Sequence, residues 1–208
     1  MVDGGPIDVL TGDYLAELTM LILWKTRSRP GGTGYARTFL AQIEDVLGTC
    51  LDRGIRIVSN AGGLDPAGLA EKVRTVAADL GLRPNIAYVT GDNLVDRVSA
   101  LQAAGEKFVH LDTGRCLADT GIEPVTANAY LGGWGIAAAL SAGADIVITP
   151  RVTDASLVVG PAAWWHGSER TDWDRLAGAV AGPSPQRLGP CRPRVGDPST
   201  VRIAATII

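Results

Sequence analysis

Residues 55–66 have the sequence IRIVSNAGGLDP. The first half is a short run rich in β-branched residues, which is typical of a buried strand. The second half ends in Asp65 and Pro66, and an acidic cap before a proline at the first helical position predicts that a helix starts here. This helix should extend to Leu80, because Gly81 suits a left-handed C-terminal cap. The stretch therefore predicts one strand–turn–helix unit.

The same alternation of strand and helix recurs on both sides of this unit. Further strands are predicted at residues 7–10, 86–90 and 145–149, and further helices at residues 14–25, 35–53, 93–104, 131–141 and about 154–166. We expect Gly12 to break the first strand. Strands separated by amphipathic helices imply right-handed βαβ units. The sequence thus predicts an incomplete α/β fold with three layers, a mostly parallel sheet with flanking helices that is Rossmann-like. Residues 108–124 interrupt the alternation and are interpreted as an excursion with a short hairpin or irregular strand.

The composition is that of a globular protein. Of the 208 residues, 46% are hydrophobic and 20% are charged, and the formal net charge is −3. This charge argues against nucleic acid or an anionic membrane as the main partner. No uncharged apolar run is long enough to span a bilayer, and the N-terminus lacks the features of a signal peptide. We therefore expect a cytoplasmic protein that binds neither nucleic acid nor membrane.

Polar side chains follow the predicted strands, where ligands gather in open parallel sheets. We expect Asp13, Asp92 and Asp154 to serve as acids or bases, and Arg151 to bind an anionic group. Other substrate-binding candidates at these strand ends are Asn60, Gly62, Gly63, Gly91, Asn128 and Tyr130. The glycines would let a ligand approach the backbone. Together these residues predict a pocket for a small molecule at one edge of the sheet.

Each of these residues also has a structural interpretation. Asp, Asn and Gly at strand-to-helix turns satisfy turn and cap geometry, and Arg151 could form a salt bridge with Asp154 or with another acidic residue at this edge. The three aspartates could bind Mg²⁺, but nothing in the sequence fixes their separation, and three cysteines and two histidines are too few and too scattered for a metal site of their own. We assign no metal site, and the sequence identifies no cofactor.

A second candidate site lies at residues 133–138, GWGIAA, which match the dinucleotide fingerprint G-x-G-x-x-A at a helix start. The segment before it is a poor strand, so close helix packing explains the glycines equally. A nucleotide-binding module therefore stays open as an alternative. Trp164, Trp165 and Trp173 form an aromatic group that suits a core or a protein interface.

The strand-end segments resemble the acyclic terpene utilisation proteins, the AtuA family, which was long a domain of unknown function. The matching segments are TGDYLAE at 11–17, IVSNAGGLDP at 57–66, VTGD at 89–92, NAYLG at 128–132 and GADIVITPRVTD at 143–154. The resemblance extends from about residue 2 to residue 182. It implies a role in acyl-CoA catabolism, including the breakdown of geranyl- or citronellyl-type compounds.

Besides the nucleotide-binding module, two functions remain open. The first is a catabolic enzyme, or a remnant of one, that acts on a small carboxylated or CoA-linked branched-chain substrate. The second is a non-catalytic partner of an acyl-CoA carboxylase-type complex that uses the tryptophan-rich face. A homo-oligomer or another protein partner is compatible with both.

The two ends of the chain differ from the family pattern. Family members start one βα unit earlier and continue further after the Trp173 helix, so the resemblance implies that residues 1–182 are a fragment of a larger family domain. The segment 183–199 is rich in proline and arginine. We interpret 183–208 as a divergent tail that forms a loop or is disordered, on the composition of 183–199.

Overall fold

A computed structural model of the chain describes residues 2–181 and 203–207. Its strands are β1 (Val9–Asp13), β2 (Arg56–Ser59), β3 (Ile86–Tyr88), β4 (Ile146–Ile148) and β5 (Ile203–Ile207). Its α-helices are α1 (Glu17–Arg27), α2 (Thr38–Asp52), α3 (Pro66–Asp79), α4 (Val98–Ala103), α5 (Trp134–Ser141), α6 (Ser156–His166) and α7 (Trp173–Ala181). Short 3₁₀ turns lie at Val2–Gly4, Val95–Arg97 and Leu117–Thr120. Among the described residues, no helix has the length and hydropathy needed to cross a bilayer.

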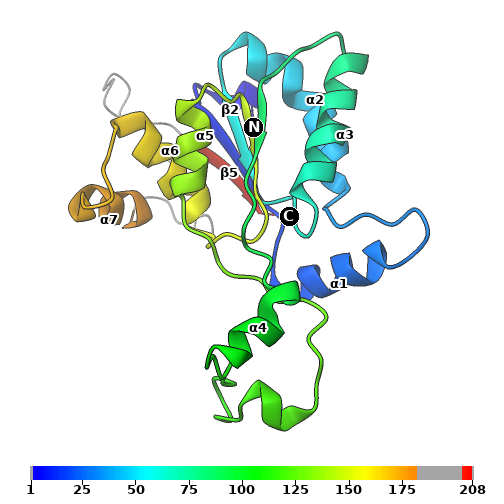
Figure 1. Ribbon diagram of the computed structural model, residues 1–208. Coiled ribbons are helices and arrows are strands. Elements are labelled where there is room, and N and C mark those ends of the chain that lie inside the picture. The colour runs from blue at the N-terminus through cyan, green and yellow to red at the C-terminus, as the bar shows by residue number, and fades with distance from the viewer. Residues whose placement is uncertain (1, 182–202, 208) are drawn as a thin grey trace.

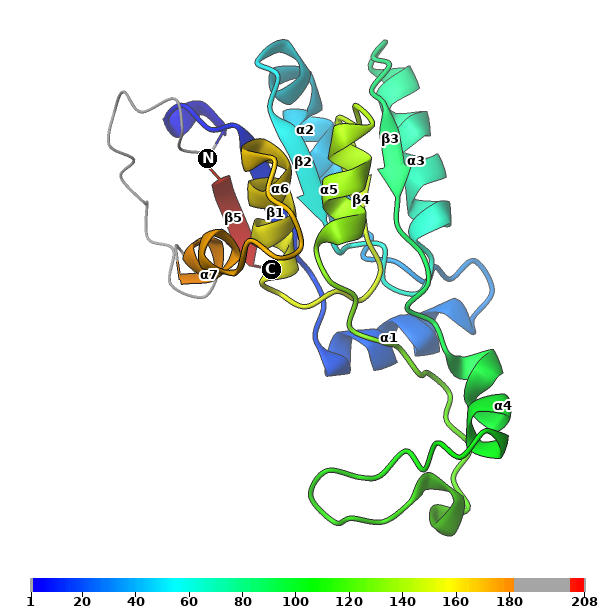
Figure 2. The same cartoon turned by 60° about the vertical axis from the view of Figure 1, so that its left-hand side comes forward.

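The strands form one sheet in the order β3-β4-β2-β1-β5, and every neighbouring pair is parallel. Alternate strand residues face opposite layers. Ile57 belongs to the buried cluster that contains residues of α1, α2 and α3, whereas Val58 belongs to the cluster that contains residues of α5 and α6. The sheet therefore lies between two helical layers (Figures 1 and 2), and the predicted three-layer α/β class with a parallel, Rossmann-like sheet is confirmed.

The unit at residues 55–81 forms as the sequence predicts. The Asp65 carboxylate accepts a hydrogen bond from the Gly68 amide at 2.9 Å, and Pro66 is the first residue of α3. Gly81 has a φ of 72°, which is the left-handed conformation expected for the residue that follows a helix.

Strand β1 corrects the prediction for the first strand. It covers Val9–Asp13 instead of residues 7–10, and Gly12 lies inside it, paired with Ser59 and Thr206. A Cβ at Gly12 would come within 2.8 Å of the Tyr14 ring. The glycine is therefore explained by the close approach of that ring and not by a turn.

Other boundaries move by a few residues. The helices expected to start at residues 14, 35, 93 and 131 start at residues 17, 38, 98 and 134, and a 3₁₀ turn precedes the third of them. Leu131 is instead joined to Val152 by an isolated parallel bridge. In the tail, residues 182–202 and 208 lie outside the described residues, which leaves the proline-rich segment untested. Residues 203–207 form β5 beside β1, so the loop or disorder expected for 183–208 is wrong for these five.

The predicted excursion is longer than residues 108–124. The chain leaves the body after β3 and returns before α5, and its two limbs are joined by an antiparallel bridge between Asn93 and Asn128. A second bridge, between Val109 and Cys116, forms the short hairpin. In both views the excursion with α4 extends beyond α1, away from the sheet (Figures 1 and 2).

Candidate functional site

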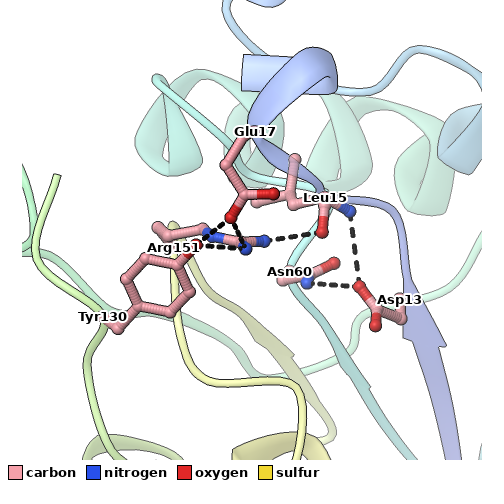
Figure 3. Close-up of polar contacts among 6 residues, drawn as sticks. All are labelled: Asp13, Leu15, Glu17, Asn60, Tyr130 and Arg151. Atoms are coloured by element: carbon pink, nitrogen blue, oxygen red, sulfur yellow. Dashed lines mark hydrogen bonds and ion pairs between the residues drawn. The ribbon is translucent and has the colours of Figure 1, made fainter. Parts of the chain in front are cut away.

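The candidate site lies at the carboxyl edge of the three central strands. Asp13 is the last residue of β1, Asn60 directly follows β2, and Arg151 is three residues beyond the end of β4. Because the strands are parallel and adjacent, these ends meet at one edge, and α1 starts beside them. Figure 3 shows the resulting group of side chains.

Asn60 fixes one half of the site. Its side chain is inaccessible to solvent, its Oδ1 accepts a hydrogen bond from the Tyr14 amide at 2.7 Å, and its Nδ2 donates to Asp13 Oδ1 at 2.8 Å. The same carboxylate oxygen accepts a hydrogen bond from the Leu15 amide at 3.3 Å. Asn60 therefore holds both the Asp13 carboxylate and the backbone that leads into α1.

Arg151 fixes the other half. The residue is 5% exposed, and its Nη1 donates to the Leu15 carbonyl at 2.6 Å. Its Nη2 donates to the Tyr130 hydroxyl at 2.8 Å and to Glu17 Oε1 at 3.0 Å, and its guanidinium carbon lies 4.4 Å from the centre of the Tyr130 ring. The Tyr130 hydroxyl donates in turn to Glu17. One buried cation thus connects the start of α1, the segment before α5 and the end of β4.

The charged groups at this edge shift one another's pKa values. Burial raises the pKa of Asp154, the nearby carboxylates of Asp13 and Glu17 raise it further, and Arg151 opposes them. The hydrogen bond from Tyr130 is the largest cause that lowers the pKa of Glu17. Burial alone would lower the pKa of Arg151, but the hydrogen bond to Tyr130 and the surrounding negative charges raise it. The edge therefore combines a permanent cation with a carboxyl group that retains its proton to a higher pH than an ordinary aspartate.

Asp92 and Asn128 form a separate contact behind Arg151. Asp92 is 5% exposed, and its Oδ2 accepts hydrogen bonds from Asn128 Nδ2 at 2.7 Å and from the Arg151 amide at 3.3 Å. Its carbonyl also accepts from the Ala129 amide at 2.7 Å. Asp92 therefore joins the two limbs of the excursion to the end of β4. These bonds give the carboxylate a structural role, and acid or base chemistry at Asp92 stays a prediction.

The three candidate glycines lie in different surroundings. A Cβ at Gly62 would come within 2.6 Å of the Thr149 carbonyl, and one at Gly63 within 2.5 Å of Leu23. Close packing of the protein itself thus accounts for both residues. Gly91 has a φ of 112° and open space around its Cα, so among these three it is the position where a ligand has room to approach the backbone.

The glycines of the nucleotide fingerprint are explained by packing as well. A Cβ at Gly133 would come within 2.8 Å of the Gly160 amide nitrogen in α6, and one at Gly135 within 3.1 Å of Val89. They let α5 lie close to α6 and to the end of β3. In the described part of the chain, no group of three or more His, Cys, Asp or Glu side chains is arranged to hold a metal ion.

Sequence reasoning did not select Glu17, although its carboxylate contacts the guanidinium of Arg151. The residue is inside the TGDYLAE motif, but the motif alone gives no sign that an exposed helix-start carboxylate reaches a strand end more than 130 positions later. An acidic residue in the first turn of a helix also has an ordinary explanation in the helix dipole. Its contact depends on where α1 lies across the sheet edge.

Comparison with known proteins supports one assignment. No curated protein and no solved structure is significantly similar to the chain. The family described as "Acyclic terpene utilisation family protein AtuA" matches residues 1–182, a range that includes every residue of the candidate site. Since this match covers most of the 208 residues, the chain belongs to the AtuA family of acyclic terpene utilisation proteins.

Proposed function

We propose that the chain acts in the cytoplasm in acyclic terpene and branched acyl-CoA breakdown, and that it binds a small carboxylated or CoA-linked substrate at the carboxyl edge of the sheet. Membership of the AtuA family supports the pathway. Asp13, Asn60, Tyr130 and Arg151 converge at one edge, and Asp154 lies near enough to Asp13 and Arg151 for their charges to shift its pKa. This convergence supports the location, because substrates of open parallel sheets bind there.

The chemistry that this edge suits best is proton transfer by Asp154. A general acid or base works best when its pKa is near the working pH, and burial together with like charges moves a carboxyl group in that direction. The observation that carries the proposal is the position of Asp154 among Asp13, Glu17 and Arg151, where its pKa is raised. Asp13, held by Asn60, provides a second carboxylate in a fixed orientation.

Isotope exchange tests proton transfer directly, whatever the complete reaction is. The protein is incubated in D₂O with isovaleryl-CoA or isovalerate, and deuterium in the acyl chain is measured by mass spectrometry. We expect exchange with wild type and a loss of about 10²-fold or more in Asp154→Asn, the usual effect of removing a general acid or base. Asp45→Asn, an exposed position on α2, is the matched control. Equal exchange in Asp154→Asn and wild type would refute the role of Asp154.

A non-catalytic partner of an acyl-CoA carboxylase-type complex is the second candidate. Its support is the exposure of Trp173 (71%) on α7 and Trp165 (39%) on α6, two neighbouring helices. In this case a purified carboxylase should form a complex that elutes as one species in size-exclusion chromatography. Trp173→Ala should abolish the complex, and an unchanged elution profile on mixing would count against this function.

A further inference from the structure

Glu17 and Arg151 form an ion pair in which the two partners are buried very differently. The Arg151 side chain is 6% exposed, whereas the Glu17 side chain is 78% exposed. Glu17 also stands at the first residue of α1, with solvent on its outer side. The contact therefore joins a buried cation to a carboxylate that is exposed to solvent.

The cation remains well supported without Glu17. Its Nη1 is bonded to the Leu15 carbonyl, and the Tyr130 ring covers its face. What Glu17 receives is one hydrogen bond from Arg151 Nη2 and one from the Tyr130 hydroxyl. Two convergent donors, one of them charged, form the arrangement that recognises a carboxylate. An ion pair with one exposed partner is also weak, because water competes for the exposed group.

We propose that the Glu17 carboxylate occupies the binding site of the substrate's own carboxylate, and that the ligand displaces it from Arg151 and Tyr130. This inference rests on the proposed function, since it assumes that the carboxyl edge binds a small carboxylated molecule. It makes Glu17 an internal competitor whose displacement sets the apparent affinity of the site.

The surrounding charges define which anion fits. The positive charge of Arg151 lowers the pKa of Asp154, while the carboxylates of Asp13 and Glu17 raise the pKa of Asp154. Exchange of Glu17 for a ligand carboxylate leaves the charge next to Arg151 unchanged. A phosphate would bring more negative charge close to Asp13 and Asp154, which costs free energy. The site therefore favours a monocarboxylate over a phosphate.

The outer surface of α1 adds an apolar component. Leu18, Leu21 and Ile22 are 68%, 37% and 51% exposed. Leu21 is one helical turn beyond Glu17 and on the same side of the helix. A carboxylate at Arg151 would thus have apolar side chains beside it for a branched tail, so the ligand class is a monocarboxylate with a branched hydrocarbon chain.

Titration of three matched probes tests the inference. Isovalerate, its neutral amide isovaleramide, and isopentyl phosphate have similar branched tails and differ in their head groups, and binding is followed by ligand-observed NMR. We expect isovalerate to bind best to wild type. Glu17→Gln removes the competing charge and keeps the side-chain shape, so it should lower the Kd for isovalerate about two- to fivefold, the range that a weak exposed ion pair allows.

The control is Glu71→Gln, which removes a similarly exposed carboxylate (70%) from a surface ion pair with Arg74 on α3 and should leave the Kd unchanged. In the Glu17→Gln background, where the competitor is absent, Arg151→Lys and Tyr130→Phe should each raise the Kd. An unchanged or higher Kd in Glu17→Gln, equal binding of isovaleramide, or tighter binding of isopentyl phosphate would each overturn the inference.

The same titration with isovaleryl-CoA separates this inference from the proposed function. If the thioester binds wild type but Glu17→Gln does not tighten isovalerate binding, the displacement of Glu17 is wrong and the proposed function stands. If neither the thioester nor isovalerate binds wild type, both proposals are wrong.

Discussion

Replacement of Asn60 by alanine should weaken the whole carboxyl edge. The substitution removes a hydrogen bond to the Asp13 carboxylate, worth about 1.5–3 kcal/mol because the acceptor is charged, and it leaves the buried Tyr14 amide without its acceptor, at a cost of about 1–3 kcal/mol. We expect a loss of about 3 kcal/mol in the free energy of unfolding. In a domain of this size that corresponds to a fall in Tm of about 6–12 °C.

Urea titration at neutral pH, followed by circular dichroism and tryptophan fluorescence, measures this loss. Asn85→Ala is the matched control, because Asn85 is exposed and its side-chain bond to the Gly143 carbonyl is long, at 3.4 Å. A double-mutant cycle with Asp13→Ala isolates the contact between the two side chains and should give a coupling of about 1.5 kcal/mol or more. A loss below about 1 kcal/mol in Asn60→Ala, or a coupling near zero, would refute the view that Asn60 organises this edge.

Three further outcomes are expected. The pKa of Asp154 is raised in the folded protein, so the wild type loses stability as the pH rises through that value. Asp154→Asn should therefore have a higher Tm than wild type at pH 7. Calorimetry should show that this difference in Tm vanishes below the ordinary pKa of aspartate. Gly133→Ala should cost about 1–3 kcal/mol through overpacking against α6, while Gly132→Ala, with open space around it, should cost far less in the same urea titration. Burial raises the pKa of the Cys50 thiol to about 11, so peptide mapping after brief alkylation at pH 8 should find the partly exposed Cys116 modified before Cys50, and early modification of Cys50 would contradict its burial.

The local sequence is sufficient for the elements whose signals are local. Asp65 and Pro66 mark the start of α3 through their own cap geometry, and Gly81 marks its end, so both are visible in the sequence. The strand-end segments can likewise be placed at one edge, because parallel strands separated by helices force their carboxyl ends to the same side. This reasoning by itself brings Asp13, Asn60 and Arg151 together.

The sequence is insufficient where distant segments decide the outcome. Gly12 resembles a turn residue in the sequence, but it lies inside a strand because Ser59 and Thr206, which are far away in the chain, pair with it. The partner of Arg151 is Glu17, whose contact depends on the path of α1 across the sheet edge. In the sequence, Gly62 and Gly63 suggest a place where a ligand approaches the backbone. Glycine is also required where the protein's own atoms approach closely, and this is the reason for both residues in the structure.

The pairing of Val9 with Ile203 has a consequence for how the protein is made. β1 is synthesised well before β5, so on the ribosome the strand that carries Asp13 exposes one hydrogen-bonding edge until β5 emerges. An open strand edge invites association with other nascent chains. Slowed elongation, or a chaperone that covers this edge, should therefore change the yield of native protein more than substitutions in the outer helices do.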